Sequence, residues 1–394
     1  MSQNSPTAAY IHIPFCRRRC YYCDFAISVV GDSALKNDST MVVDYVNNLC
    51  QEIKLTSVKK QPLSTIFFGG GTPSLLPVEK LKYILKTIEN YLGIAPNAEI
   101  SLEIDPGTFN LQQLKKYFKI GINRISLGVQ TFDSQLLTSC GRSHSVKDIF
   151  DAIDLIKQAN FENFSIDLIT GLPHQTIEHC HQSLETAIDI APPHISCYDL
   201  VIEPVTAFGK QYKPGKTPLP TDETTAEMYR LSQKMLTKEG YQHYEISNYA
   251  QLGYQCRHNK VYWKNEPYYG FGMSAASYFN NKRFSRPRTR KSYYDWVQKG
   301  AVIDAPFLSK SDRLLETLML GLRLAQGIDL FDITESFGEE ITSKILNYLK
   351  PYIENNLAIV IDDNHTEFRL KLTDPDGFLL SNTILTTLFE KLED

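Results

Sequence analysis

Short runs rich in β-branched and aromatic residues alternate with helix-length segments through the first half of the chain. The predicted strands cover residues 9–13, 65–68, 99–104, 124–129, 164–169 and 194–198. The predicted helices between them, with apolar residues at i, i+3 and i+4, cover 41–54, 78–90, 111–120, 146–159 and 177–190. This alternation predicts an α/β fold in which βα units surround a parallel sheet, either open or curved into a partial barrel.

The order of predicted elements changes near residue 309, where three helices precede two short strands and a closing helix. A chain of 394 residues is also longer than one ordinary core requires. We therefore expect a smaller C-terminal α+β domain that resembles a winged helix. The expected boundaries are a first domain over 1–210, a connector over 211–305 and the C-terminal domain over 306–394.

Charge and targeting signals narrow the class of protein. The formal net charge is -4, which gives no electrostatic reason to expect nucleic acid as a partner. One basic run, KRFSRPRTRK at 282–291, is predicted to be a solvent-exposed loop. The N-terminus lacks the pattern of a secretory signal and no stretch is apolar enough to span a membrane, so we expect a cytoplasmic protein with reduced cysteines.

Polar and glycine residues gather just after the predicted strands. They are Cys16, the GGGTP stretch that starts at Gly69, Glu103, Asp105, Gln130, Asp167, Gly171, Tyr198 and Asp199. In parallel α/β folds, ligands bind at the carboxyl ends of the strands. These residues are therefore predicted to converge on one binding site.

The stretch CRRRCYYCDF places Cys16, Cys20 and Cys23 at C-x3-C-x2-C spacing. A structural zinc site would need a fourth ligand, and His12 is the nearest candidate, although it lies inside a predicted strand. A [4Fe-4S] cluster usually takes four thiolates, so three leave one iron with open coordination positions. Open positions are what metal-based chemistry requires.

The cysteine loop resembles that of radical S-adenosylmethionine (SAM) proteins, in which the unligated iron chelates the amino and carboxylate groups of SAM. YIHIPFC, FFGGGTPSLL, SLEIDPG, RISLGVQ, GRSH and SIDLITGLPHQT extend the resemblance to the subfamily of the oxygen-independent coproporphyrinogen III oxidase and its haem-chaperone relatives. The resemblance runs from about Tyr10 to the end and implies a partial (β/α)6 TIM-like barrel. It also implies SAM contacts at Tyr10, Gly70, Gly71, Thr72, Glu103, Gln130, Arg142 and Asp167.

Two departures separate the chain from the oxidase. The oxidase motif has a fourth cysteine where this sequence has Phe25, and the oxidase carries a longer segment before the first strand. The HNxxYW sequence further along resembles the chaperone branch, which implies haem contacts at His258, Tyr262 and Trp263. His258 offers an imidazole for haem iron and Cys256 is an alternative thiolate, whereas a turn-capping histidine beside packed aromatic rings is the structural alternative.

The resemblance therefore implies a haem chaperone that holds a [4Fe-4S] cluster, SAM and haem, without coproporphyrinogen oxidase activity. The alternatives are porphyrin decarboxylation by the oxidase reaction and a winged-helix regulator that senses iron. The implied partners are haem and client haem proteins, membrane-associated respiratory enzymes among them, and a second copy of the chain in a homodimer. No residue pattern in the sequence indicates the clients or the dimer.

Overall fold

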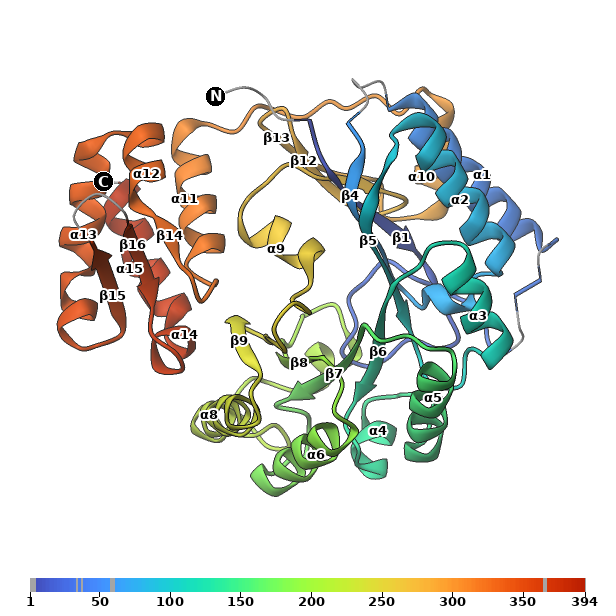
Figure 1. The fold of residues 1–394 in the computed structure, drawn as a ribbon, viewed down its shortest axis with the longest axis horizontal. Helices are drawn as coiled ribbons and strands as arrows, with labels where there is room; N and C mark the ends of the chain where they lie inside the picture. The colour runs from blue at the N-terminus through green and yellow to red at the C-terminus, as the bar shows by residue number, and fades with distance from the viewer. Residues whose placement is uncertain (1–4, 33–34, 37, 57–60, 364–366, 394) are drawn as a thin grey trace.

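A computed structural model describes residues 5–32, 35–36, 38–56, 61–363 and 367–393. Its centre is a curved sheet that stays open, with β11 at one edge and β9 at the other (Figure 1). The parallel strands, in spatial order, are β11 (Tyr269–Phe271), β1 (Ala8–Ile13), β4 (Leu63–Gly70), β5 (Ile94–Ile104), β6 (Arg124–Gln130), β7 (Phe164–Thr170) and β8 (His194–Asp199). The predicted partial barrel is confirmed.

Helices cover the outer face of the sheet, as the βα alternation predicts (Figure 1). They are α1 (Thr40–Leu55), α2 (Val78–Tyr91), α3 (Leu111–Lys119), α5 (Val146–Gln158), α6 (Ile177–Ile190) and α8 (Asp222–Lys238). Side-chain caps fix where several of them start. The hydroxyl of Ser145 and the carboxylate of Asp148, for example, form a capping box at the start of α5. The five helices predicted from apolar periodicity are confirmed.

Three strands from the expected connector join the main sheet. β10 (Asn248–Ala250) pairs antiparallel with β8, and β9 (Gln242–Glu245) pairs antiparallel with β10. At the other edge, β11 pairs parallel with β1, with Ala9 opposite Tyr269. The short helix α9 (Arg257–Trp263) lies in the gap between the two edges of the partial barrel (Figure 1).

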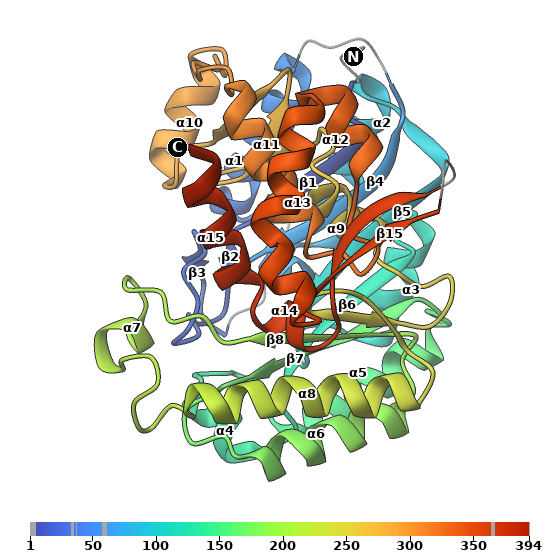
Figure 2. The same cartoon turned by 90° about the vertical axis from the view of Figure 1, so that its left-hand side faces the viewer.

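The C-terminal unit has its own apolar core, which includes Leu318, Leu330, Ile345, Leu370 and Leu388. Its strands form a three-stranded sheet in the order β14 (Ile328–Asp329), β16 (Phe368–Leu372), β15 (Ala358–Asp362). Its helices are α11 (Lys310–Gly321), α12 (Leu330–Phe337), α13 (Glu339–Glu354), α14 (Asp376–Leu379) and α15 (Ser381–Glu393). Figure 2 shows α13 and α15 side by side, with β15 next to α13. The predicted α+β unit is confirmed, and β14 adds a third strand.

The basic run 282–291 is not the solvent-exposed loop that its charge predicts. Its first residues form β13 (Lys282–Ser285), which pairs with β12 (Ala276–Phe279) in a hairpin. Its last residues begin α10 (Arg290–Gln298). Between these elements, Arg286 is buried and forms an ion pair with Glu52 of α1. A buried acid partner, which lies far away in the sequence, therefore overrides the local charge pattern.

Within the described residues, no helix combines the length and the apolar character that a membrane span requires.

Candidate functional site

One cavity of about 890 Å³ collects the predicted site residues on the inner side of the partial barrel. The three clustered cysteines and every predicted SAM contact line it. His258 and Tyr262 of α9 line the same cavity, whereas Trp263 does not. The convergence expected from the carboxyl ends of the strands is therefore present, and two of the three expected haem contacts line the same space.

The cysteine loop begins at β2 (Phe15–Cys16), which pairs with β3 (Ser28–Val29). Cys16 is buried, whereas Cys20 and Cys23 are partly exposed at the cavity wall. Arg19 donates to the carbonyl oxygens of Cys23 and Phe25 at 3.1 and 3.0 Å, so it shapes the loop from within. Phe25 itself is 54% exposed and lines the cavity.

Arg142 directs a hydrogen-bond donor toward a cysteine sulfur, because its Nη1 lies 3.5 Å from Cys20 Sγ. Thr72 Oγ1 lies 3.9 Å from Cys16 Sγ, but the single proton of this hydroxyl is donated to Asp105. Burial and the Asp105 carboxylate raise the pKa of Cys16 to about 12, so a metal centre must displace its proton. Donors aimed at thiolate sulfur stabilise an iron–sulfur cluster and tune its potential. The donor set therefore fits a cluster held by Cys16, Cys20 and Cys23.

His12 does not supply a fourth ligand. Its Nε2 lies 2.9 Å from the carbonyl oxygen of Ala26, and its Nδ1 lies 3.1 Å from the Tyr10 hydroxyl. Within the described ranges, no group of three or more Cys, His, Asp and Glu side chains is arranged to hold a single metal ion. The zinc alternative gains no support from this geometry.

The glycine turn after β4 permits close backbone packing around the cysteine loop. Gly70 has φ +110°, and a Cβ there would clash with the His12 ring. A Cβ on Gly71 would lie 2.9 Å from Cys16 Sγ and 2.7 Å from the Phe15 carbonyl oxygen. Side chains at these two positions would therefore displace both the strand and the cysteine loop.

Glu103, one residue before the end of β5, lines the cavity beside the glycine turn. Its Oε2 accepts from the backbone N–H of Gly70 at 3.0 Å. Burial, followed by the charge of Asp167, raises the pKa of Glu103 to about 8. The carboxyl group is therefore largely protonated near pH 7 in the absence of a ligand, and it accepts from an amino group only after it has lost this proton.

We expect SAM affinity to rise with pH because of Glu103. Below its raised pKa of about 8 the carboxyl is uncharged, so up to about tenfold in affinity is lost per pH unit of acidification. The SAM amino group also titrates, and Glu103→Gln separates the two effects because it keeps the shape and removes the ionisation. Anaerobic calorimetry from pH 6.5 to 8.5 should give a steeper profile for the wild type. Equal slopes would contradict the role of Glu103.

Asp167 of β7 lies at the centre of a ring of serine hydroxyls. Ser126, Ser196 and Ser165 donate to its carboxylate at 2.6, 2.7 and 3.1 Å. Burial raises the pKa of Asp167, and these hydroxyls partly offset that effect. The three hydroxyls hold the Asp167 carboxylate in place and occupy three of its four lone-pair positions. The fourth position can accept from a hydroxyl of the predicted ribose.

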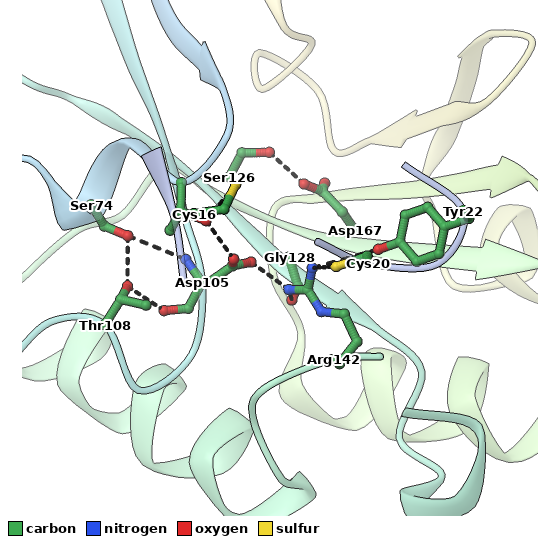
Figure 3. A network of polar contacts seen from close by, with 11 residues as sticks. Cys16, Cys20, Tyr22, Ser74, Asp105, Thr108, Ser126, Gly128, Arg142 and Asp167 are labelled. Carbon is green, nitrogen blue, oxygen red and sulfur yellow. Dashed lines mark hydrogen bonds and ion pairs between the residues drawn. The ribbon is translucent and has the colours of Figure 1, made fainter. Parts of the chain in front are cut away.

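The guanidinium of Arg142 is already engaged in a hydrogen-bond network and is not free to bind a ligand carboxylate through both of its terminal nitrogens (Figure 3). Its Nη2 pairs with Asp105 and donates to the Gly128 carbonyl oxygen at 2.9 Å. Thr72 donates to the other oxygen of Asp105 at 2.9 Å. The sequence grouped Asp105 with the cavity residues, but its pairing with Arg142 becomes visible only in the fold.

Gln130 ends β6 with φ +71°, where the pairing with β7 shifts register. This irregularity follows Gly128, whose Cβ would lie 2.8 Å from Asp105 Oδ1. A bulge at a strand end re-aims the side chain that follows it. The register shift therefore turns the end of β6 so that Gln130 lines the cavity.

His258 is fully buried and both of its ring nitrogens have partners. Nδ1 lies 2.8 Å from Thr65 Oγ1, and Nε2 lies 2.8 Å from the Tyr262 hydroxyl. The imidazole also stacks on Phe67, with ring centroids 5.3 Å apart. One of these hydrogen bonds has to break before His258 can ligate haem iron.

Cys256, the alternative haem ligand, is buried outside the cavity lining. Its thiol donates to Glu99 Oε1 at 3.6 Å, and burial raises its pKa to about 12. The two Glu99 oxygens also accept from the backbone N–H groups of Arg257 and His258, each at 3.0 Å. In this arrangement Cys256 packs at the start of α9 and does not face the ligand space.

Sequence reasoning did not identify five further polar side chains that line the cavity. They are Tyr22, Arg124, Ser126, His194 and Ser196. A signal was present, because polar residues at alternating positions of an otherwise apolar strand point to the same face. Arg124 with Ser126 and His194 with Ser196 follow that pattern. The inner face of this sheet is therefore polar over much of its length.

Comparisons with known proteins agree with this geometry. Residues 10–187 match the radical SAM superfamily, and residues 308–374 match the HemN C-terminal domain. The chain is 50% identical to "Heme chaperone HemW" of Synechocystis sp. over 99% of this chain and 98% of the relative. It is 36% identical to the protein of the same name from Bacillus subtilis, over 98% and 100% of the two chains.

The fold also matches a solved structure, that of coproporphyrinogen III oxidase (HemN) from Escherichia coli, described as a radical SAM enzyme. The TM-score is 0.81 at 24% identity, over 97% of this chain and 90% of that chain. Membership of the superfamily implies a [4Fe-4S] cluster and SAM, and the cysteines, glycine turn and polar ring of the cavity fit both. By its full-length identity, the chain belongs to the radical SAM superfamily and, within it, to the HemW family.

Proposed function

We propose that the chain is a haem chaperone that binds haem and transfers it to client haem proteins. The observation that carries the proposal is the 50% identity, over nearly the whole of both chains, to a relative named as a haem chaperone. The cavity supports it, because α9 with the HNxxYW sequence lines the same space as the cysteine loop. Haem and the cluster with its SAM would therefore be neighbours.

The cluster would be held by Cys16, Cys20 and Cys23. When bound and reduced, such a cluster supplies an electron that can cleave SAM to a 5'-deoxyadenosyl radical. The residues of this chain position SAM through the glycine turn, Glu103 and the ring around Asp167. We propose that the cluster and SAM regulate haem transfer rather than oxidise a porphyrin, because Phe25 stands where the oxidase motif has its fourth cysteine.

For haem itself we propose contacts along the cavity face of α9. Tyr262 presents its ring there, packed edge-on against Tyr268 with centroids 4.6 Å apart. His258 is the proposed axial ligand, and binding would exchange its hydrogen bond with Tyr262 for the iron. Trp263 lies at the end of α9 outside the cavity lining, so its proposed contribution is the packing of that end of the helix.

We expect haem titration under anaerobic conditions to give a saturable Soret shift in the wild type. His258→Ala removes the proposed axial ligand and should weaken binding by at least tenfold, with a changed Soret maximum. Asn259→Ala is the matched control, because this neighbouring residue lines the same cavity and has no assigned iron contact. An unchanged spectrum in His258→Ala would contradict the proposed ligand.

The oxidase reaction is tested in the same preparation. With reductant, SAM and coproporphyrinogen III, we expect no protoporphyrinogen above the background without enzyme. Formation of protoporphyrinogen at a catalytic rate would overturn the chaperone proposal in favour of the oxidase. Salt-sensitive DNA binding would instead favour the regulator.

We further propose that the clients include membrane-associated respiratory enzymes and that the chain works as a homodimer in the cytoplasm. Glu339 and Glu340 at the start of α13 are exposed, and these carboxylates support a protein contact through the C-terminal unit. Analytical ultracentrifugation with and without haem tests the dimer.

A further inference from the structure

Two polar groups on the inner face of the sheet are buried without a partner. Arg124 at the start of β6 is 2% exposed, and its Nε has no hydrogen-bond partner in the described part of the chain. His194 at the start of β8 is 1% exposed, and its Nδ1 likewise has none there. Both residues line the large cavity. An unpaired buried guanidinium is costly to the fold, so its retention calls for a ligand.

The neighbouring carboxylates do not satisfy Arg124. The oxygens of Glu99 accept from the backbone N–H groups that begin α9 and from the Cys256 thiol, and neither of them bonds to Arg124. Asp167 accepts from three serine hydroxyls and forms no hydrogen bond or ion pair with Arg124. Among the described residues, Arg124 forms no side-chain hydrogen bond or ion pair. Its planar array of donors is therefore available to the cavity.

The hydrogen bonds around His194 indicate that its Nδ1 carries the ring proton and can donate to the cavity. The N–H of Cys256 lies 3.3 Å from the Tyr244 hydroxyl oxygen, and that hydroxyl lies 2.8 Å from His194 Nε2. If the tyrosine oxygen accepts from Cys256, its own proton points to Nε2. We assign the imidazole proton to Nδ1 on this basis. Burial and the charge of Arg124 hold the pKa of His194 well below its usual range, so the ring is neutral.

We propose that Arg124 and His194 form a carboxylate anchor for a second ligand on the floor of the cavity, and that this ligand is haem, held by a propionate. The inference rests on the proposed haem-chaperone function and adds to it a binding group that the HNxxYW sequence does not contain. A guanidinium edge with an adjacent N–H donor matches a carboxylate and not an apolar ring edge.

The anchor is separate from the cysteine loop. Arg124 and Gln130 are the first and last residues of β6, six residues apart. At about 3.3 Å per residue, the strand places their Cα atoms roughly 20 Å apart. Arg142, which contacts Cys20, donates to Gly128, so the cysteine loop lies toward the Gln130 end, whereas Glu103 and Asp167 lie level with Ser126 and Gly128 in the middle of β6. A carboxylate bound at Arg124 is therefore too far from the cysteines to be one that is chelated at the cluster.

The test compares haem with haem dimethyl ester, which keeps the iron and ring but has no free carboxylate. In the wild type we expect haem to bind roughly 10- to 100-fold more tightly than the ester. This is the difference expected when one charged hydrogen bond, that between Arg124 and a propionate, is missing from the complex with the ester. In Arg124→Met, haem should fall to the affinity of the ester. Arg288→Met is the control, because this exposed arginine lines the same cavity and should keep the preference.

The melting temperature of the ligand-free protein is a second measurement. Replacing an unpaired buried guanidinium with an apolar side chain of similar length should leave it unchanged or raise it, whereas a structural role predicts a fall. Wild-type protein that binds haem and the ester equally would overturn the anchor and leave the chaperone function standing. Wild-type protein that binds neither would overturn the function, and the anchor with it.

Discussion

Replacing Cys20 with alanine is expected to abolish the iron–sulfur cluster. With only Cys16 and Cys23 left, too few thiolates remain to hold it, so anaerobically reconstituted Cys20→Ala should lack the brown absorbance and acid-labile sulfide. SAM binding should be lost with the cluster. Haem binding should persist, because no proposed haem contact involves Cys20. Absorbance spectra and iron and sulfide analysis measure the first effect, and haem titration measures the second.

Cys140→Ala is the matched control. Cys140 lies next to the cysteine loop, where its carbonyl oxygen accepts from the N–H of Tyr21 at 3.0 Å, but its side chain is buried and does not line the cavity. This variant should keep a full cluster. Loss of the cluster in Cys140→Ala, or its retention in Cys20→Ala, would contradict the assignment of ligands. Simultaneous loss of cluster and haem in Cys20→Ala would show that the two ligands are interdependent across their shared cavity.

The sequence predicted well which residues line the cavity at the carboxyl ends of the strands, and the reason is geometric. Parallel strands end at one edge of a sheet, so Cys16, Glu103 and Gln130 have to meet once the βα order is recognised. The sequence did not predict that Arg124 and His194 line the cavity, because they lie at the amino ends of their strands. There a polar residue is the first in its strand and looks like part of the preceding loop.

Long-range pairing accounts for the other differences. β11 is a three-residue segment that completes one edge of the sheet by pairing with β1, about 260 residues earlier in the chain. Nothing local to Tyr269–Phe271 indicates that partner. The bonds of His258 to Thr65 and of Cys256 to Glu99 likewise join residues from distant parts of the sequence. Motif resemblance placed these residues near haem, whereas only the fold shows which of their atoms are already engaged.

The same long-range effect yields the largest expected change in stability. Arg286 Nε lies 2.7 Å from Glu52 Oε1, and their side chains are only 3% and 1% exposed. The other oxygen of Glu52 accepts from the Gly272 N–H at 2.9 Å and from the Tyr293 hydroxyl at 2.6 Å. The pair therefore ties the β12–β13 hairpin and α10 to α1, beside the β1–β11 edge of the sheet.

Arg286→Met should lower the free energy of unfolding by about 3–5 kcal/mol, because it leaves the Glu52 charge buried without its cation. The double variant Glu52→Gln/Arg286→Met should recover much of that loss, since the remaining amide is neutral and can still accept from Gly272. Arg288→Met, two residues away and exposed, should change stability by less than about 0.5 kcal/mol. Urea unfolding with an unchanged m-value measures all three. If Arg286→Met and Arg288→Met proved equally mild, the ion pair would not be what holds the hairpin, and solvent exposure of the whole basic run would again be the better description.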